Sequence, residues 1–176
     1  MPPNHCKIIW LTGLSGAGKS TLAEKVSEFL NSKSVKSRII DGDDVRKTMK
    51  VQKFTESEIV QNNLRVIQIC RNLANEYEFL LVAVIAPFRK TRQKARETFG
   101  TNYTEVYVQA SMETLMKRDT KGLYQKAFYG EIENLIGVDP KTPYEEPWSP
   151  ELTIDTDKET AENSASKIIN FIAKIM

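Results

Sequence analysis

The sequence contains few of the residues that build disulfide frameworks and metal centres. Its 176 residues include two cysteines, Cys6 and Cys70, and one histidine, His5. The cysteines share no C-x-x-C or metal-ligand spacing, which excludes a disulfide-stabilised fold and a zinc site. His5 lies so close to the first residue that a surface position is expected for it.

Long hydrophobic runs and a strong charge imbalance are absent as well. No apolar run reaches the roughly 20 residues of a membrane-spanning helix, and the first residues contain no signal-peptide core. The net charge is only +2, and the one dense basic cluster is residues 88–96. So mild a charge argues against a nucleic-acid partner. We therefore expect a soluble, cytoplasmic protein that binds neither nucleic acid nor membrane.

What the sequence does contain is a phosphate-binding loop. Residues 13–20, GLSGAGKS, satisfy G-x-x-x-x-G-K-[ST] at every fixed position, between a strand-like and a helix-like segment. The glycines let successive backbone N–H groups turn toward phosphate oxygens. Lys19 adds a charge for the β- and γ-phosphates of ATP, and the Ser20 hydroxyl is a ligand for Mg²⁺. The expected ATP-binding residues are Gly13, Leu14, Ser15, Gly16, Ala17, Gly18, Lys19, Ser20 and Thr21.

Strand-like and helix-like segments alternate along the whole chain. The expected strands are residues 7–12, 37–43, 79–86, 104–110 and 151–155. The expected helices are residues 20–30, 56–77, 90–98, 112–118 and 159–175. This alternation predicts one α/β domain over residues 1–176, with a doubly wound parallel sheet of about five strands and helices on both faces.

Two local patterns refine this prediction. Thr55 and Glu58 have the spacing of a capping box, which marks the start of the long helix. Residues 119–150 are rich in glycine, proline and aromatics, and an irregular segment of that length in a compact domain is usually a lid or a binding loop. We expect a lid there.

Motors and switches among the P-loop proteins need motifs that this chain lacks. The most apolar segment, residues 79–86, is followed by Pro87 and not by the metal-binding Asp of a hydrolytic motor. The sequence has no N-K-x-D for guanine, and the D-x-x-G at residues 119–122 follows a helix, so we interpret it as a coincidence. Both classes are therefore disfavoured.

The carboxylates cluster instead after the second expected strand, at Asp41, Asp43 and Asp44. The carboxyl ends of parallel strands face the crevice beside the phosphate loop. An aspartate there can orient an acceptor hydroxyl and help to hold Mg²⁺, and Arg46 can bind an anionic acceptor. The pattern favours a small-molecule kinase.

Several stretches together resemble the adenylylsulfate kinase (APS kinase) family, whose members transfer the ATP γ-phosphate to the 3′-hydroxyl of adenosine 5′-phosphosulfate (APS). The matching stretches are WLTGLSGAGKST (10–21), DGDDVR (41–46), FTESEIVQNNLRV (54–66), APFRKTRQKAR (86–96), EVYVQASMETLMKRDTKGLYQKAFYGEIENLIGVD (105–139) and PYEEPWSPELTIDT (143–156). They follow the family order through nearly the whole chain. RDTKGLYQKA, GEI and PYEEP are much more specific than the phosphate loop.

This resemblance implies a P-loop kinase fold and roles for individual residues. It implies a catalytic role for Lys19, Asp43, Arg118 and Lys121, and a metal site at Ser20 and Asp43. The acceptor-binding residues that it implies are Asp41, Asp43, Arg46, Phe54, Asn62, Pro87, Phe88, Arg89, Lys121, Gly122 and Leu123. Related kinases are commonly homodimers, so a homodimer is expected.

Three positions depart from the family pattern. Ile59 replaces an arginine that contacts the acceptor, Ala86 replaces a serine, and GVDPKTPYEEP contains two extra residues. Loss of an arginine removes a charge-assisted hydrogen bond to an anionic acceptor. A kinase of the same fold that acts on another 5′-modified nucleotide, such as cytidine diphosphoramidate, therefore stays open, as does a protein that holds ATP without transferring phosphate.

Overall fold

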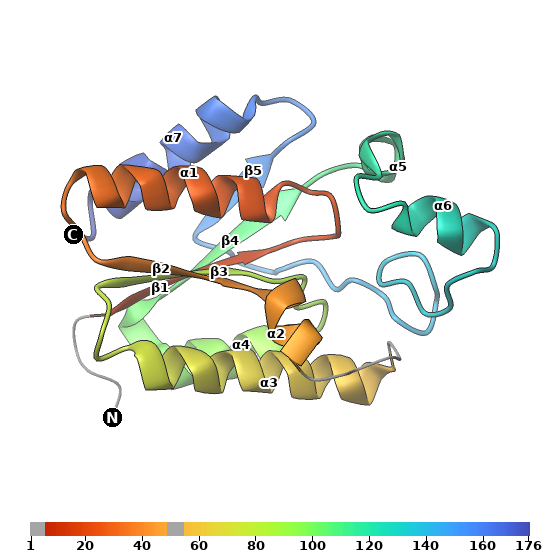
Figure 1. Ribbon diagram of the computed structural model, residues 1–176, viewed down its shortest axis with the longest axis horizontal. Helices are drawn as coiled ribbons and strands as arrows, with labels where there is room; N and C mark the ends of the chain where they lie inside the picture. The colour runs from red at the N-terminus through yellow and green to blue at the C-terminus, as the bar shows by residue number, and fades with distance from the viewer. Residues whose placement is uncertain (1–5, 49–54) are drawn as a thin grey trace.

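A five-stranded parallel sheet forms the centre of the protein, whose computed structural model describes residues 6–48 and 55–176 (Figure 1). The strands are β1 (Lys7–Thr12), β2 (Ser37–Asp41), β3 (Phe79–Ala83), β4 (Tyr103–Gln109) and β5 (Leu152–Asp155). Their order is β2-β3-β1-β4-β5, and every pairing is parallel. In the central strand, Ile8 pairs with Leu80 on one side and with Tyr103 on the other. The predicted doubly wound sheet is confirmed.

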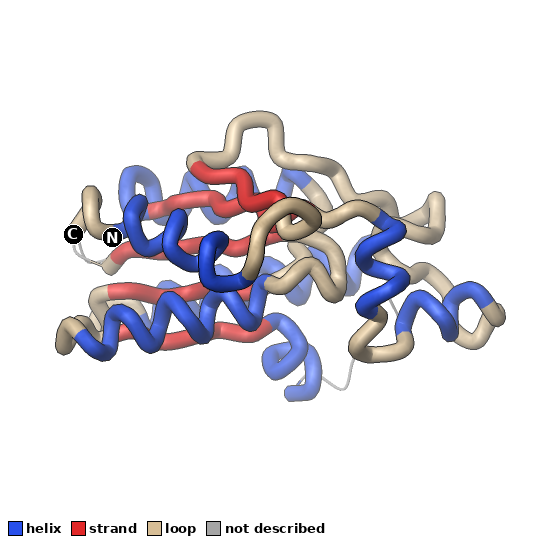
Figure 2. The backbone as a smooth tube through the Cα atoms, turned by 90° about the horizontal axis from the view of Figure 1, so that it is seen from above, coloured by secondary structure: helices blue, strands red, loops and turns tan. Residues whose placement is uncertain are grey.

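Helices cover both faces of this sheet. They are α1 (Lys19–Ser32), α2 (Gly42–Thr48), α3 (Glu56–Leu73), α4 (Arg89–Phe99), α5 (Met112–Arg118), α6 (Leu123–Phe128) and α7 (Ala161–Ile172), with a 3₁₀ turn at Gly100–Asn102. Figure 1 shows α1 and α7 on one face and α3 and α4 on the other. Helices α5 and α6, with the loops around them, extend beyond one end of the sheet (Figures 1 and 2). None of the helices in the described part of the chain is long and apolar enough to cross a membrane.

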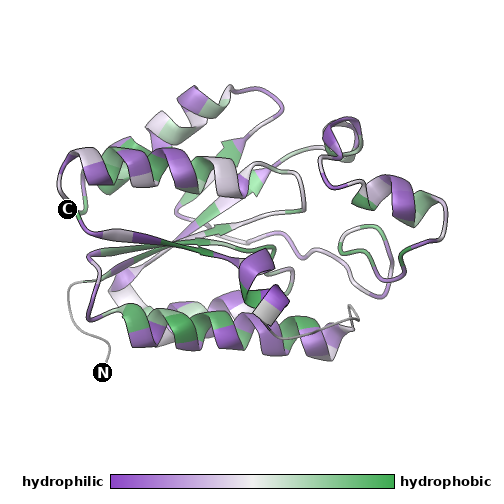
Figure 3. Ribbon diagram, in the orientation of Figure 1, coloured by the Kyte–Doolittle hydropathy of each residue, from purple (hydrophilic) through white to green (hydrophobic). Residues whose placement is uncertain are grey.

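Alternating side chains of the central strand enter two hydrophobic cores. Ile9 and Leu11 pack with the residues of α1 and α7, whereas Ile8 and Trp10 pack with those of α3 and α4. A strand buried on both faces is hydrophobic throughout, which Figure 3 shows for the middle of the sheet. Each fully buried leucine or isoleucine contributes roughly 1.5–3 kcal/mol, so these cores hold the phosphate loop on a rigid base.

The long helix α3 begins where the capping box predicts. The Thr55 hydroxyl accepts a hydrogen bond from the Glu58 backbone N–H, and the Glu58 carboxylate accepts one from the Thr55 backbone N–H. These two bonds satisfy backbone donors that a helix leaves unpaired at its start. The helix ends at Leu73, before the predicted residue 77.

Two short helices lie in segments where no helix was predicted. Helix α2 includes the last two residues of the strand expected at 37–43, and α6 lies inside the irregular 119–150 segment. The Asp41 carboxylate accepts the Asp43 backbone N–H, which turns the chain from β2 into α2. Helices of six and seven residues are shorter than two full turns and leave no readable hydrophobic period.

Strand β3 is also shorter than predicted and ends at Ala83. Beyond it, the Ile85 carbonyl accepts a hydrogen bond from the side-chain hydroxyl of Thr12, the last residue of β1, at 2.6 Å. Ala86 then has a positive backbone φ of 44°, a conformation that residues other than glycine rarely adopt. The segment that follows β3, residues 84–88, is therefore a strained connection, and below it is called the 84–88 loop.

Candidate active site

The phosphate loop connects β1 to α1 in the geometry that its motif predicts. At Gly13, an added Cβ would lie 2.2 Å from the Val108 carbonyl oxygen, so no larger residue fits. Gly18 caps α1 with a left-handed φ of 103°. Backbone N–H groups at the start of a 14-residue helix carry a partial positive charge that favours phosphate.

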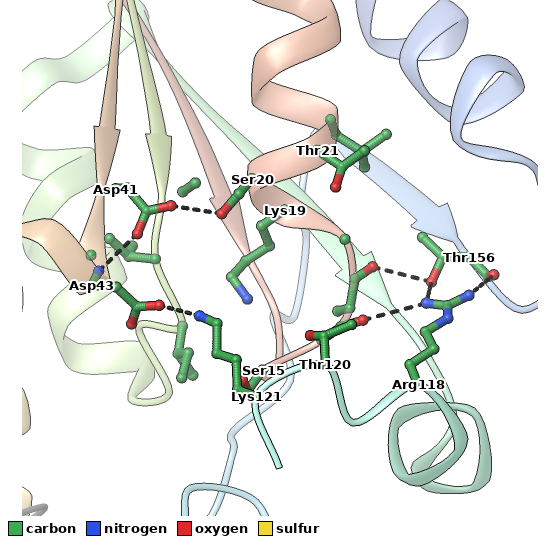
Figure 4. A pocket seen from close by; sticks show the side chains of 18 of the residues that line it. Ser15, Lys19, Ser20, Thr21, Asp41, Asp43, Arg118, Thr120, Lys121 and Thr156 are labelled. Atoms are coloured by element: carbon green, nitrogen blue, oxygen red, sulfur yellow. Dashed lines mark hydrogen bonds and ion pairs between the residues drawn. The ribbon is translucent and has the colours of Figure 1, made fainter. Parts of the chain in front are cut away.

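A cavity of about 360 Å³ lies beside this loop (Figure 4). Residues of the phosphate loop, of β2, of α2 and of the lid line it together. The predicted residues among them are Ser15, Gly16, Ala17, Gly18, Lys19, Ser20, Thr21, Asp41, Asp43, Arg46, Arg118 and Lys121. Gly13 and Leu14 do not line this cavity.

Lys19 is the buried charge of the cavity. Its side chain is 8% exposed, and its Nζ donates a hydrogen bond to the Leu14 carbonyl at 2.8 Å. Burial, with repulsion from Lys121, lowers the Lys19 pKa to about 8, although Asp43 and Asp41 act in the opposite direction. Burial makes the charged form of Lys19 unfavourable, so an anionic ligand beside it would stabilise that charge.

The Ser20 hydroxyl lies next to Asp41. It donates a hydrogen bond to the Asp41 carboxylate at 2.6 Å, while the other oxygen of Asp41 accepts the Asp43 backbone N–H at 2.8 Å (Figure 4). The structure thus brings Asp41, and not Asp43, to the hydroxyl that the motif assigns to a metal. A carboxylate and a hydroxyl that share one hydrogen bond are both hard oxygen donors, and so they fit Mg²⁺.

Asp43 faces a cluster of cations from three parts of the chain. Its carboxylate forms an ion pair with Lys121 of the lid (Figure 4) and a longer one, at 3.8 Å, with Arg46. Burial alone would raise the pKa of the Asp43 carboxyl, but Lys121, Arg46 and Lys19 together lower it. Asp43 is therefore a carboxylate at neutral pH and can only accept hydrogen bonds there.

Arg118 closes the opposite side of the cavity. Its guanidinium donates hydrogen bonds to the Thr156 carbonyl at 2.7 Å and to the Thr156 hydroxyl at 3.0 Å. The Thr156 hydroxyl in turn donates to the Ala17 carbonyl at 3.2 Å. Sequence reasoning did not identify Thr156, although its position directly after β5, at the carboxyl edge of the sheet, was a usable signal.

The lid is fastened to the phosphate loop. The Asp119 carboxylate accepts the backbone N–H groups of Tyr124 and Gln125 at the start of α6, and the Tyr124 hydroxyl donates to the Ser15 carbonyl at 2.8 Å. Gly122 turns the chain with a positive φ of 63°. The D-x-x-G at residues 119–122 is thus part of the turn into α6, which agrees with its interpretation as a coincidental match.

A second, smaller pocket of about 30 Å³ adjoins the first. Its wall includes Arg46, Ile59, Asn62 and Pro87 of the predicted positions, together with Ile136 of the lid. Ile59 is 7% exposed and belongs to a hydrophobic cluster with Phe88 and Ile136. The Asn62 Oδ1 atom is buried without a hydrogen-bond partner in the described part of the chain. Ile59 and Asn62 thus both line this pocket from α3.

Other predicted acceptor residues lie elsewhere. The Arg89 guanidinium lies over the Trp148 ring at 4.6 Å, and its Nε donates to the Glu146 carbonyl. Phe88 is buried in the hydrophobic cluster, and neither Gly122 nor Leu123 lines the two pockets. Phe54 is outside the described residues.

Comparison with known proteins shows which family the chain resembles. The adenylylsulphate kinase family model matches residues 5–155. An adenylyl-sulfate kinase of Halothermothrix orenii is 43% identical over 165 residues, which are 93% of this chain and 88% of that protein. A probable adenylyl-sulfate kinase of Archaeoglobus fulgidus is 41% identical over 152 residues, 86% of this chain and 96% of that protein.

Solved structures agree with these relatives. The structure of the Mycobacterium tuberculosis APS kinase CysC in complex with AMPPNP and APS matches with a TM-score of 0.89 and 30% identity, over 97% of this chain and 99% of that chain. A gluconokinase from Sinorhizobium meliloti matches in fold alone, with a TM-score of 0.61 and 16% identity. The phosphate loop and the two adjoining pockets agree with these relatives. The chain therefore belongs to the adenylylsulphate kinase family.

Proposed function

We propose that this kinase transfers the γ-phosphate of ATP to the 3′-hydroxyl of APS and so forms 3′-phosphoadenylyl sulfate. The observation that carries the proposal is that the phosphate-loop cavity adjoins a second pocket through Gly42 and Arg46 of α2, the helix that also bears Asp43. A donor phosphate and an acceptor nucleotide need adjoining sites with a carboxylate close to where they meet, and Asp43 lines the first pocket next to the shared Gly42.

The charges around the cavity support a role for each residue. The backbone N–H groups of the loop and Lys19 bind the donor phosphates, while Arg118 and Lys121 stabilise charge on the transferring group. Asp43 is held as a carboxylate, so it accepts a hydrogen bond from the 3′-hydroxyl and orients it. For this to happen, the acceptor takes the place of Lys121 at the Asp43 carboxylate.

Ser20 and Asp41 would hold Mg²⁺ in this proposal, with Asp43 close by. When bound, Mg²⁺ would neutralise charge on the β- and γ-phosphates of ATP. The Ser20–Asp41 hydrogen bond supports the pair, because it holds two oxygen ligands side by side before any metal arrives. We also propose that the protein is a cytoplasmic homodimer. Sedimentation of the purified protein would measure its oligomeric state.

The experiment that tests the function is a comparison of acceptors. ADP release from ATP is measured with APS and with cytidine diphosphoramidate, and the products are identified by mass spectrometry. We expect turnover with APS and phosphorylation at the ribose. Faster turnover of the cytidine nucleotide than of APS would overturn the choice of acceptor. If neither acceptor leads to ADP release, the proposed kinase activity would be overturned.

Replacement of Ile59 by arginine tests how the smaller pocket binds an anionic acceptor. A charge-assisted hydrogen bond contributes about 1.5–3 kcal/mol, so we expect the KM for APS to fall by about ten- to a hundredfold in Ile59→Arg. The variant should also unfold at a lower temperature, because Ile59 packs against Phe88 and Ile136. Steady-state kinetics and thermal unfolding measure the two effects.

Gln61→Arg is the matched control for that variant. Gln61 is exposed on the same helix, so its replacement adds the same charge outside the pocket. Its KM for APS should stay within about twofold of the original. An unchanged KM in Ile59→Arg would mean that residue 59 does not contact the acceptor.

A further inference from the structure

Arg92, on the first turns of α4, is a buried arginine whose guanidinium binds three separate parts of the fold. Its side chain is 3% exposed. Its Nε lies 2.8 Å from the Glu105 carboxylate of β4, and its two terminal nitrogens donate to the carbonyls of Ala86, at 2.6 Å, and of Glu145, at 2.5 Å. The guanidinium also lies over the Tyr144 ring at 5.6 Å. Its two terminal nitrogens are therefore directed at two backbone carbonyls, while Glu105 balances its charge.

One of these partners belongs to the wall of the smaller pocket, and a second belongs to a segment that is hydrogen-bonded to that wall. Ala86 is in the 84–88 loop, where it lines the pocket with Pro87. Glu145 is in residues 144–151, the last part of the lid region, which leads into β5 and below is called the segment returning from the lid. The two segments are also joined directly, since the Glu145 N–H donates to the Pro87 carbonyl at 2.9 Å and the Glu145 carboxylate accepts the Arg89 N–H at 2.6 Å.

The 84–88 loop needs such support because its backbone is strained. Ala86 has a positive φ of 44°, and conformations of this kind persist only where neighbouring contacts impose them. Its carbonyl accepts the Arg92 bond, and the preceding carbonyl, of Ile85, accepts the Thr12 hydroxyl. Thr12 in turn is 3.0 Å from the Tyr144 hydroxyl. Arg92 and Tyr144 thus hold the loop through residues that do not themselves line the smaller pocket.

We infer that Arg92 is a positioning residue for the acceptor nucleotide: it fixes the 84–88 loop to the segment returning from the lid and so sets the shape of the acceptor pocket. This inference rests on the proposed function, because it takes the smaller pocket as the acceptor site. Arg92 itself is not among the described residues that line either pocket, so it acts through Ala86 and Pro87 and not by touching a substrate.

The geometry of the guanidinium explains why lysine would not serve here. A lysine keeps the positive charge but has one ammonium group in place of a planar fork, so it cannot reach Glu105, Ala86 and Glu145 together. A buried carbonyl that loses its donor is strongly destabilised and tends to move toward another partner. In Arg92→Lys we therefore expect the 84–88 loop to relax and the acceptor to bind less well.

Arg96 offers a matched control one turn further along α4. It too pairs with Glu105, at 3.3 Å, and it forms ion pairs with Glu151 and lies over the Tyr103 ring. In the described residues, none of its contacts reaches the 84–88 loop or residue 145. Arg96→Lys thus disturbs the same charge network, including the Glu151 end of residues 144–151, but it leaves the contacts of Ala86 and Glu145 in place.

The kinetic test compares the two variants in the purified enzyme. We expect Arg92→Lys to raise the KM for APS by about tenfold or more, with the KM for ATP within about twofold and kcat lowered by a smaller factor. Arg96→Lys should change none of these constants by more than about twofold, although both variants unfold at lower temperature. An equal rise in the KM for APS in both, or no rise in Arg92→Lys, would overturn the inference.

Two further measurements keep the test decisive. Should Arg92→Lys not fold, Tyr144→Phe removes only the hydroxyl near Thr12, and it should raise the KM for APS about threefold with the KM for ATP unchanged; an unchanged KM for APS would count against the inference. Hydrogen exchange of the ligand-free proteins needs no acceptor. The amides of Arg89 and Glu145 should exchange at least about tenfold faster in Arg92→Lys than in Arg96→Lys.

These readouts separate the inference from the proposed function. If the unmodified enzyme does not phosphorylate APS, the proposed function fails, while the exchange rates still show whether Arg92 holds the loop. If it does phosphorylate APS and the variants differ in neither KM nor exchange, the inference about Arg92 fails alone.

Discussion

Replacement of Lys19 by methionine should lower kcat by at least about 10²–10³-fold and yet raise the melting temperature of the nucleotide-free protein. The kinetic loss follows because Lys19 is the one cation that the phosphate-loop motif places on the β- and γ-phosphates, and removal of a preorganised charge of this kind has an effect of that size. Methionine keeps most of the aliphatic chain, so packing changes little.

The gain in stability follows from the pKa of Lys19, which burial lowers from 10.5 to about 8 in the folded protein. A group whose pKa falls on folding disfavours the folded state when it is charged. Below pH 8 the charged Lys19 side chain lowers the free energy of unfolding by about 3 kcal/mol. This effect disappears as the pH rises from about 8 to 10.5. The difference in melting temperature between Lys19→Met and the original protein should therefore be largest near neutral pH and shrink over that interval.

Lys25→Met is the control for both measurements. Lys25 lies on the same helix and forms an exposed ion pair with Glu162 at 3.0 Å, so its loss should change neither kcat nor the melting temperature appreciably. A folded Lys19→Met protein with near-normal turnover would contradict the assignment of the ATP site. A lower melting temperature in Lys19→Met than in the original protein would contradict the buried charge as a source of instability.

Asp43→Asn should lower kcat by about 100-fold or more, while the KM for ATP changes much less. The substitution keeps the shape of the side chain but removes the negative charge that faces Lys121, Arg46 and Lys19. An amide accepts the acceptor hydroxyl poorly and cannot balance those cations, so the loss falls on the chemical step. Initial rates over a range of ATP and APS concentrations separate the two effects.

Neighbouring aspartates provide the comparison. Asp44 is exposed and paired with Lys47 at 2.9 Å, so Asp44→Asn should leave kcat nearly unchanged. Asp41→Asn weakens the contact with Ser20 and should act mainly on the KM for ATP. If Asp44→Asn or Asp41→Asn carries the large loss in kcat and Asp43→Asn is mild, the roles within the cluster are assigned wrongly.

The parts of the fold that could be predicted are those with local signals. The phosphate loop has a fixed motif, α3 has a capping box at Thr55, and β3 is hydrophobic throughout because both of its faces are covered. The short helices α2 and α6 could not be predicted in this way. They begin at turns made by the carboxylates of Asp41 and Asp119, which local hydrophobicity does not reveal.

Candidate residues such as Lys19 and Asp43 could be named from the sequence, but their contacts with other residues could not. That Asp43 pairs with Lys121, or that Ser20 bonds to Asp41, depends on how distant segments meet at the carboxyl edge of the sheet. The buried partners of Arg92 are of the same kind, because they are backbone carbonyls and carry no residue-type signal. The family resemblance implied roles for single positions and nothing about these pairs.

The order of the strands also limits when the protein can begin to fold during synthesis. Strand β1 is made first, yet its two neighbours are β3 and β4, which follow much later in the chain. As the chain leaves the ribosome, β1 therefore has no neighbouring strand until β3 (Phe79–Ala83) has emerged. Its other side stays unpaired until β4 (Tyr103–Gln109) has emerged. Parallel sheets with such distant pairings fold slowly and expose apolar strands meanwhile. We expect nascent chains that end before β4 to depend on chaperones, whereas the finished chain closes its central strand from both sides.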